Sequence, residues 1–462
     1  MSYQVPQHID PNKVFIVNLS NIERRLDPEP YHNERINAIN KIKQTSHYLP
    51  LSSIVSFEKE ITKNIIRQGD KYLGLENISS EYGEYVETTE KESISSAAIF
   101  HKGDILFPKL RPYLNKVFFA TFDGICSTEF YVLKSNSVNA EYLSIFLRSS
   151  LVVNQTKHLM TGNTLPRLQT EDVRDLLIPI PSIIIQQRII DCYNAAYTQK
   201  LQKEEQTKAL LQSIDEYLLN ELGIQLPETK SQTIQDRMFV VNFSELSGDR
   251  LDVEYNNPHK HGAISKILKS AKYSTALLSF LAKDIFQGIG KDETDDSTYV
   301  LLKVKNILRG NMIDYSDVEF VKSVPQNKLL LRNDIISPFI GEAVRQIKFS
   351  LFDKEEYRYT VDNNTGVIRL KESVNAQYVC EYLCSCLGKM QIERLIGGGG
   401  VPFLGSSGAK KLTIVVPPLQ KQQEIVDHIS SIRQQAKALQ EEGKAILEQA
   451  KKEVEQMILG QA

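Results

Sequence analysis

The sequence has no tryptophan, few cysteines and no excess of either charge. Among its 462 residues there are 0 Trp and 5 Cys, and the formal net charge is −2. A small, odd number of cysteines in a long chain argues against a disulfide framework. The near-zero net charge excludes a basic surface over the whole protein, but it is compatible with a local basic face.

The sequence also lacks long apolar runs and nucleotide-binding loops. No apolar run reaches the ~18 residues that a membrane span needs. The first residues, MSYQVPQHIDPNK, have neither the basic region nor the apolar region of a signal peptide. No GxxxxGK[ST] loop is present, which excludes an NTP-driven motor of that class. We therefore expect a cytoplasmic protein with no membrane partner.

Most of the chain is instead an internal duplication. KVFIVNLSNIERRLDPEPY at residues 13–31 is repeated as RMFVVNFSELSGDRLDVEY at 237–255, and IPIPSIIIQQRII at 178–190 is repeated as IVVPPLQKQQEIV at 414–426. The separation drifts from about 224 to about 236 residues, so the duplication covers nearly everything. Two similar modules predict a pseudo-two-fold molecule, which is suited to binding duplex DNA.

Each copy begins with a region of mixed structure. Short apolar runs bounded by turns predict strands, for example DILFPKL and EFYVLK in the first copy and YVLLKV and DIISPF in the second. A single helix starting at asparagine is expected at 139–156 and again at 375–395. A Gly-rich turn and a short β-like run ending in proline follow in both copies.

A long helix ends each copy. In the second copy, apolar residues recur in alternating steps of four and three over about 33 residues, or roughly 50 Å, which is a heptad seam. The same register in the first copy has a polar middle. Because a two-fold axis relates the copies, we expect the helices to pair antiparallel. The residues expected to pair them are Ile189, Tyr193, Leu210, Ile214, Ile425, Ile429, Ile432, Leu439 and Ile446, and the strict register continues to Tyr217, Glu221, Glu453 and Met457.

A basic and aromatic run is the best candidate for a ligand site. KGDILFPKLRPYLNK at 102–116 contains Lys102, Lys109, Arg111, Tyr113 and Lys116. Arg and Lys side chains reach phosphates or guanine edges, and a tyrosine can position or stack. The alternative is a solvated strand edge protected by lysines.

The matching stretch of the second copy, SPFIGEAVRQIKF at 337–349, carries Arg345 and Lys348 but has Gly341 where Arg111 stands. This divergence, beside matching helices, is what we expect of two modules that read different DNA sequences.

The Gly-rich turns are the second candidate. GNTLP at 162–166 matches GGGVP at 398–402, and Arg167 follows the first turn. Ordering several glycines has a large entropic cost, so close approach of the backbone to a phosphate or a groove would explain them. Gly162, Asn163, Arg167, Gly398 and Gly399 are therefore predicted to contact DNA. A flexible turn that caps a helix is the alternative.

Three further motifs favour ordinary structural roles. FQGIG at 286–290 resembles the cofactor loop of methyltransferases that use S-adenosylmethionine, but no Asn-Pro-Pro-aromatic motif accompanies it. Cys380, Cys384 and Cys386 lie on an expected helix on which the third cysteine does not share the face of the first two, so core packing is favoured over metal binding. Glu228 and Lys230 resemble part of a nuclease element but have no neighbouring strand. No catalytic residue and no metal site are predicted.

The ordered set of motifs resembles one family. GDILFPKLRPYLNKV, GICSTEFYVL, GNTLPRL and IPIPSIIIQQRI, with the second-copy counterparts NDIISPF, GGGGVPFL and VVPPLQKQQEIV, look like the specificity subunit of type I restriction–modification systems. The resemblance covers essentially the whole chain. It implies an α+β fold with two similar target recognition domains of mixed α/β structure, each followed by a long helix, and the two helices pairing as an antiparallel coiled coil. The expected boundaries are 1–179 for the first domain, 180–223 for its helix, 224–236 for a linker, 237–415 for the second domain and 416–462 for its helix.

The resemblance also implies a function. A non-catalytic subunit would read double-stranded DNA, with each domain recognising one half of a bipartite, asymmetric site. The helices would set the gap and dock two modification (methyltransferase) subunits, and restriction (translocase–nuclease) subunits would join them. S-adenosylmethionine, ATP and magnesium would belong to those partners, with no cofactor in this chain.

Three alternatives remain open from the sequence. One is the specificity subunit of a type IIB-like enzyme, whose partner both methylates and cuts. Another is a self-contained DNA methyltransferase that uses FQGIG. A coiled-coil scaffold is the third, but it leaves two large globular modules without a role.

Overall fold

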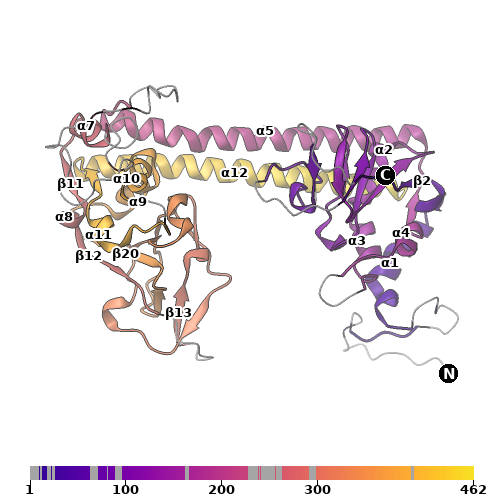
Figure 1. Cartoon of the computed structure of the whole chain (residues 1–462), viewed down its shortest axis with the longest axis horizontal. Helices are drawn as coiled ribbons and strands as arrows, with labels where there is room; N and C mark the ends of the chain where they lie inside the picture. The colour runs from indigo at the N-terminus through magenta and orange to yellow at the C-terminus, as the bar shows by residue number, and fades with distance from the viewer. Residues whose placement is uncertain are drawn as a thin grey trace. The chain divides into compact units, whose positions relative to one another are not determined.

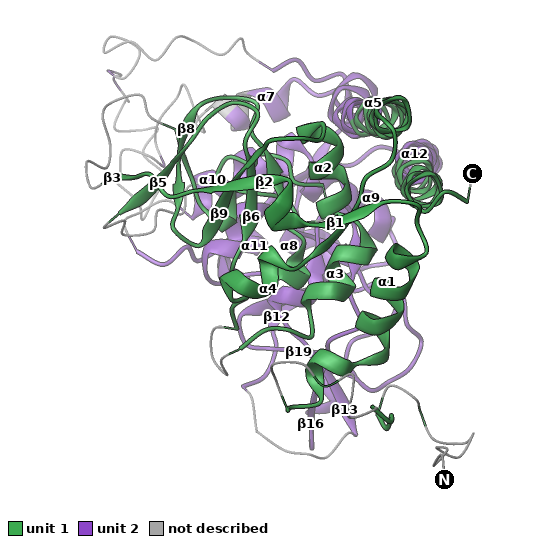
Figure 2. Ribbon diagram, turned by 90° about the vertical axis from the view of Figure 1, so that its right-hand side faces the viewer, with its two compact units in different colours: residues 1–204, 440–462 green, residues 205–439 purple. Residues whose placement is uncertain are grey.

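The computed structural model describes residues 10, 13–17, 22, 26–62, 71–80, 82–88, 96–161, 166–226, 238, 240, 255, 263–290, 298–396 and 400–461. Contacts divide the chain into two compact units (Figure 2). Unit 1 consists of Met1–Glu204 with Gln440–Ala462, and unit 2 of Glu205–Leu439. None of the described helices is long and apolar enough to cross a membrane.

Unit 1 contains two four-stranded sheets, in the orders β2-β9-β6-β7 and β3-β5-β8-β4, and a separate β1-β10 pair. Neighbouring strands are antiparallel except β4 and β8. The strands are β1 (Tyr48–Pro50), β2 (Val55–Glu58), β3 (Ile61–Thr62), β4 (Tyr72–Leu73), β5 (Ala97–Phe100), β6 (Ile105–Pro108), β7 (Phe118–Phe119), β8 (Gly124–Ser127), β9 (Phe130–Ser135) and β10 (Leu177–Pro179). Its short helices are η2 (Glu29–Tyr31), α1 (Asn33–Lys43), η3 (Leu51–Ser53), η4 (Leu75–Asn77), η5 (Pro112–Leu114), α2 (Ala140–Leu147), α3 (Ser150–Thr156) and α4 (Thr170–Arg174).

Unit 2 has a similar plan with a smaller second sheet and one more strand pair. Its sheets have the orders β12-β20-β17-β18 and β16-β13-β19, and β11-β21 and β14-β15 form separate pairs. The strands are β11 (Thr275–Leu277), β12 (Ala282–Gln287), β13 (Tyr299–Leu302), β14 (Ile307–Leu308), β15 (Met312–Ile313), β16 (Glu319–Val321), β17 (Ile335–Pro338), β18 (Ser350–Leu351), β19 (Tyr359–Val361), β20 (Thr365–Leu370) and β21 (Thr413–Val415). Its short helices are α7 (Ala263–Lys269), α8 (Leu278–Leu281), η8 (Val304–Asn306), η9 (Gln326–Lys328), η10 (Glu342–Gln346), α9 (Ala376–Cys384), α10 (Cys386–Leu395) and α11 (Gly405–Lys410).

The prediction of one helix before each Gly-rich turn was wrong. The structure has two helices there in each unit, α2 with α3 and α9 with α10. The residue directly before the second helix, Ser149 in unit 1 and Ser385 in unit 2, has an extended backbone, which interrupts the helical hydrogen bonds. The Ser385 hydroxyl accepts a hydrogen bond from Leu387 N at 3.2 Å and so caps the second helix. Apolar periodicity continues across such a break, which is why the sequence pattern did not show it.

Each unit connects its mixed domain to the start of a long helix through a buried glutamine. Gln186 Oε1 accepts a hydrogen bond from the backbone N–H of Asn139 at 3.0 Å, and Gln422 Oε1 does the same for Asn375 at 2.8 Å. Both amide groups donate to the carbonyl of a proline that precedes the helix, at 2.9 and 2.7 Å. The asparagine side chains in turn cap α2 and α9. The duplication therefore extends to individual buried hydrogen bonds.

The long helices are α5 (Ile183–Leu222) and α12 (Leu419–Ile458), which lie side by side within each unit (Figure 1). In unit 1, Lys203 Nζ donates to Glu442 Oε2 at 2.8 Å. In unit 2, Lys421 Nζ lies 2.6 Å from Glu221 Oε2. Residue numbers rise along α5 as they fall along α12, so the pairing is antiparallel, and the predicted fold class is confirmed.

The strict heptad register fails toward the C-terminal end of each helix. Leu218 and Leu222 are buried where the register placed Tyr217 and Glu221. The buried positions in α12 include Leu447, Val454 and Ile458 in place of Ile446, Glu453 and Met457. An α-helix has about 3.6 residues per turn, so residues spaced by a strict 3.5-residue repeat gradually rotate away from the partner helix. Extra four-residue steps keep the buried residues facing the partner.

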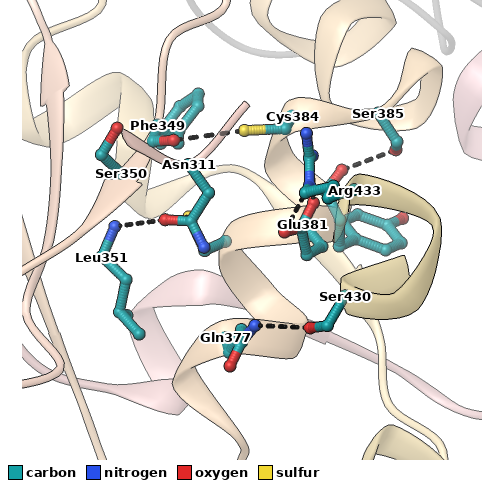
Figure 3. Close-up of polar contacts among 12 residues, drawn as sticks. Asn311, Phe349, Ser350, Leu351, Gln377, Glu381, Cys384, Ser385, Ser430 and Arg433 are labelled. Atoms are coloured by element: carbon teal, nitrogen blue, oxygen red, sulfur yellow. Dashed lines mark hydrogen bonds and ion pairs between the residues drawn. The ribbon is translucent and has the colours of Figure 1, made fainter. Parts of the chain in front are cut away.

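A buried ion pair connects α9 to α12 in unit 2 (Figure 3). Arg433 binds Glu381 through Nη2–Oε2 at 2.6 Å and Nε–Oε1 at 3.2 Å. The side chain of Glu381 is 1% exposed. Ile145 and Tyr197 occupy the corresponding places in unit 1. The two copies thus have different kinds of residue at these equivalent positions.

Candidate nucleic-acid interface

In unit 1 the basic run and the segment after the first Gly-rich turn lie side by side. Leu110 forms an antiparallel bridge with Arg167, and Arg111 N donates to Pro166 O at 3.3 Å. The run contains β6, while Pro166 and Arg167 directly follow residues 162–165, which lie outside the described part of the chain. Two stretches that the sequence suggested separately are therefore neighbours in space.

Unit 2 builds the same junction from different residues. Ile340 forms an antiparallel bridge with Phe403, and Gly341 N donates to Pro402 O at 2.8 Å. Gly341 has φ +91° and Arg111 has φ +48°. Both positions thus require a positive φ, for which glycine has no steric cost. Gly341 also has ψ 176°, a backbone region that is essentially restricted to glycine, whereas Arg111 lies in the left-handed helical region with ψ 56°. This difference in backbone conformation explains the glycine that stands in place of Arg111.

The cationic group of Lys109 faces the protein. Its Nζ donates to Thr128 O at 2.6 Å and lies 4.8 Å from the centroid of the Tyr131 ring. Burial lowers the pKa of Lys109, and the nearby carboxylate of Glu129 opposes that shift. Lys109 also lines a cavity of about 290 Å³, together with Arg174 and other residues.

The other residues of the first basic run differ in how accessible they are. Lys102 and Arg111 are exposed, and Tyr113 is 45% exposed. Lys116 is half-buried, and its Nζ donates to Leu75 O at 2.8 Å. Lys102, Arg111 and Tyr113 thus present the most accessible part of the run.

Arginines near each junction have acidic neighbours. Arg167 binds Glu129 in a bidentate ion pair, which lowers the pKa of the Glu129 carboxyl below its usual value, mainly through the hydrogen bonds from Arg167. In unit 2, Arg345 Nε lies 3.5 Å from Glu342 Oε2, and Lys348 is half-buried. Gly162, Asn163, Gly398 and Gly399 lie outside the described residues. Their DNA contacts remain a prediction.

Exposed apolar residues distinguish the second junction. Val401 is 72% exposed and Phe403 is 51% exposed. Phe403 occupies the position that Arg167 has in unit 1, because each follows the proline of its Gly-rich turn directly. The sequence did not single out these two residues, although the comparison of GNTLPR with GGGVPF shows the exchange.

The weaker motifs have structural explanations. A Cβ atom on Gly288 of FQGIG would lie 1.9 Å from Val361 O, so close approach of two backbones requires this glycine. Cys380 is buried, and Cys384 Sγ donates to Phe349 O at 3.3 Å (Figure 3). Glu228 and Lys230 lie outside the described residues. Within the described part of the chain, the only His, Cys, Asp and Glu side chains close enough to share a metal ion are His32, Glu34 and His158.

Comparison with known proteins identifies the family. The family model described as the type I restriction modification DNA specificity domain matches residues 41–213 and 290–449. The chain belongs to this family. Both matched segments contain one of the two junctions, and the resemblance read from the sequence is confirmed.

Individual relatives agree with the family. The chain is 29% identical to the type I restriction enzyme EcoDI specificity subunit of Escherichia coli over 105 residues, which cover 22% of this chain and 23% of that protein. It is 22% identical to the MjaIX specificity subunit of Methanocaldococcus jannaschii over 343 residues, 72% of each protein. A solved chain from a study of assembly and conformational transition of a type I R-M system covers 90% of this chain and 98% of its own length, with a TM-score of 0.52 and 18% identity. That likeness supports the fold alone.

Proposed function

We propose that this chain is the non-catalytic, sequence-reading subunit of a type I restriction–modification complex, and that it binds double-stranded DNA. The family membership carries this proposal, because the matched model is that of a DNA specificity domain and covers both copies. The paired junctions support it, since each joins a turn rich in glycine to a strand end. Such segments can approach a DNA backbone closely.

The two units read the two halves of a bipartite, asymmetric site. The support is the chemical difference between equivalent places. Unit 1 has Arg111 and Arg167 at its junction, whereas unit 2 has Gly341 and Phe403 there. A guanidinium group favours phosphates and guanine edges, whereas an apolar side chain favours thymine methyl groups. Two similar scaffolds that carry different contacting side chains would recognise different DNA sequences.

The long helices set the gap between the half-sites and dock two modification subunits, to which restriction subunits add. The support is that α5 and α12 each have 40 residues, or about 60 Å of continuous helix. That length is comparable with one to two turns of DNA at 34–36 Å each. S-adenosylmethionine, ATP and magnesium are used by the partners, and the complex acts in the cytoplasm.

The alternatives have less support. Gly288 of FQGIG packs closely against the backbone of Val361, so its glycine is explained by packing rather than by a cofactor. A type IIB-like system shares the recognition subunit and differs only in its partner, so neighbouring genes distinguish the two. The family model favours the type I system.

Methylation mapping tests the proposal. Genomic DNA from the host and from a strain lacking this gene is sequenced for methylated bases. We expect one bipartite, asymmetric motif to lose methylation in the deletion strain, and to regain it on complementation. A matched complementation with Arg111→Asn should methylate that motif less completely. An unchanged methylome in a strain with active modification subunits would contradict the proposal.

A further inference from the structure

A cavity in unit 1 lies where β2 stops pairing with β9. β2 pairs with β9 as far as Glu58 opposite Val132, whereas β6 pairs with β9 as far as Pro108 opposite Phe130. Glu58, Phe130 and Tyr131 are among the residues that line a cavity of about 290 Å³ beside this gap. Small-molecule sites have volumes of about 300–1,000 Å³, so the cavity suits a small ligand with a single ring system.

Three cationic side chains, those of Lys59, Lys109 and Arg174, line this cavity. None of the three forms an ion pair with a carboxylate of the described part of the chain. Burial lowers the pKa of Lys109, although the Glu129 carboxylate acts in the opposite direction. Partial burial of a cation without a paired carboxylate costs free energy. A negatively charged group bound in the cavity would offset that cost.

Two of these cations lie over aromatic rings of the cavity wall. The guanidinium carbon of Arg174 lies 5.4 Å from the centroid of the Phe57 ring, and Lys109 Nζ lies 4.8 Å from that of Tyr131. The two rings pack edge to face with centroids 5.8 Å apart. Guanidinium planes and aromatic side chains both stack on planar rings. The wall therefore offers a planar anionic ligand both a stacking surface and positive charge.

One carboxylate also lines the cavity. Glu58 Oε1 accepts a hydrogen bond from Ser56 Oγ at 2.8 Å. A carboxylate repels a simple anion such as phosphate, but it accepts hydrogen bonds from the amino group of a nucleobase, as Glu and Asp do with cytosine. Together these groups favour a ligand that combines an anionic group with an amino-bearing ring.

The second copy fills the equivalent place with a side chain of its own. Phe339 stands at the position of Lys109, and Gly366 stands at the position of Tyr131 in the strand register. Phe339 is fully buried, and a Cβ atom on Gly366 would lie 2.1 Å from its ring. An apolar ring on a glycine thus replaces an ammonium group on a tyrosine. The shared fold therefore does not require the charged cavity of unit 1.

We propose that this cavity binds one nucleotide whose base carries an amino group. Lys109 and Arg174 hold the phosphate, and Glu58 accepts a hydrogen bond from the amino group. The aromatic wall and the guanidinium plane provide the surface on which the base stacks.

The nucleotide has two possible sources, a free mononucleotide or a unit of bound DNA that is turned out of the double helix. The second source rests on the proposed DNA-binding function, and the first does not. The place of the cavity fits a DNA unit, because Glu129 of the ion pair with Arg167 lies in the chain between Thr128 and Phe130 of the cavity wall.

Calorimetric titration of the full chain with mononucleotides tests the free source. We expect the 5′-monophosphate of deoxyadenosine or deoxycytidine to bind more tightly than thymidine monophosphate, which has no amino group, and than inorganic phosphate. Arg174→Gln and Lys109→Met should each weaken binding by about tenfold or more, the effect of losing one charge-assisted hydrogen bond. Glu58→Leu removes the acceptor and should remove the preference over thymidine monophosphate. Lys134→Met, at an exposed lysine of β9 outside the cavity, should leave binding unchanged.

Fluorescence of 2-aminopurine tests the DNA source. This base is placed in turn at each position of both half-sites of the motif found by methylation mapping, except at the methylated bases. A base that leaves the stack fluoresces more strongly, so we expect a rise at one position when the assembled complex binds. Arg174→Gln should abolish that rise while the complex still binds DNA, and Lys134→Met should retain it.

Thermal unfolding of each variant checks that the fold is retained. Arg174 is exposed, so its substitution leaves the hydrogen bond from Lys109 to Thr128 in place. If the complex binds DNA but no mononucleotide binds and no 2-aminopurine position responds, the cavity assignment is wrong and the proposed function stands. Equal results for Arg174→Gln and Lys134→Met would also overturn the assignment. If the complex does not bind DNA, the proposed function is wrong, and the mononucleotide titration decides the assignment.

Discussion

Arg167 and Glu129 form a bidentate ion pair, with Nε–Oε2 at 3.0 Å and Nη2–Oε1 at 2.9 Å. The pair lies at the junction between the basic run and the first Gly-rich turn. Both side chains are partly exposed, at 44% for Arg167 and 30% for Glu129. A DNA phosphate near this place would compete with Glu129 for the same guanidinium group.

The first prediction concerns this competition. Glu129→Gln removes the carboxylate and leaves Arg167 available to DNA, so the assembled complex should bind DNA more tightly at low salt. One added phosphate contact should steepen the salt dependence of log K by about one unit. Titrations over a salt series measure both effects. Glu171→Gln, at an exposed carboxylate in α4, removes the same charge without freeing Arg167. Equal binding by the two variants would contradict the prediction.

The second prediction is the pH dependence of the same pair. Hydrogen bonds from Arg167 lower the pKa of folded Glu129 below its unfolded value of about 4.3. A carboxyl with a lowered folded pKa stabilises the fold above the unfolded pKa, and that contribution is lost as the pH falls through the lower, folded pKa. The stability advantage of the unaltered chain over Glu129→Gln should therefore shrink on acidification below about pH 4. Urea unfolding at several pH values measures it. An advantage that grows with acidification would contradict the assignment.

The third prediction separates two basic residues. Arg111→Asn should weaken DNA binding with little loss of stability, because asparagine tolerates a positive φ. A lost phosphate contact would lower the salt slope by about one unit, and a lost base contact would cost about 1–3 kcal/mol. Lys109→Ala should also lower the melting temperature, because Thr128 O loses its donor. Lys134→Ala, at an exposed position of β9, is the control. If Arg111→Asn and Lys134→Ala both bind DNA as tightly as the unaltered chain, the basic run is not part of the DNA interface.

The fourth prediction tests the seam between the long helices. Leu218→Ala and Leu447→Ala should each lower the free energy of unfolding by about 2–5 kcal/mol, since both side chains are buried. Tyr217→Ala and Ile446→Ala, at their partly exposed neighbours, should cost less. Denaturant unfolding of the four variants compares the observed register with the strict heptad. Larger losses of stability at Tyr217 and Ile446 would instead support the strict heptad register.

The fifth prediction concerns the role of the helices in spacing. Four residues inserted into α5 after Gln199, with four inserted at the facing point of α12, lengthen the pair by about 6 Å. At about 3.4 Å per base pair, the recognised gap should grow by one or two pairs while both half-sites stay the same. Methylation mapping reads out the gap. Four residues inserted after Gln225, beyond the end of α5, lengthen the chain but not the helices and should leave the gap unchanged. A change within a half-site, with the gap preserved, would contradict the role of the helices.

The duplicated elements were the predictable part of the fold. Long helices and strands carry periodic apolar patterns, and two copies of one pattern confirm each other. The seam could be predicted in its N-terminal part, where Ile189, Ile425 and Ile429 are buried. It failed near Leu218 and Leu447, because a strict repeat ignores the accumulated drift of a helix.

The polar contacts within each unit were much less predictable. Lys109 was identified by its charge, but only the fold shows that its ammonium group faces Thr128. The contacts of His158 with Glu29 and Glu34 were missed because these residues lie far apart in the sequence. Gln186 and Gln422 stood in matching motifs, and their repetition was a signal of a shared buried role that the sequence reasoning did not use.

The buried glutamines also bear on how such a chain can be rearranged. Gln186 with Asn139, and Gln422 with Asn375, make the same hydrogen bonds between a domain and the helix that follows it. A domain from one copy would therefore find its expected partner groups at the start of the helix of the other copy. The two domains are interchangeable parts at this connection. New combinations of half-sites could arise by exchange of whole domains, without any change in the helices.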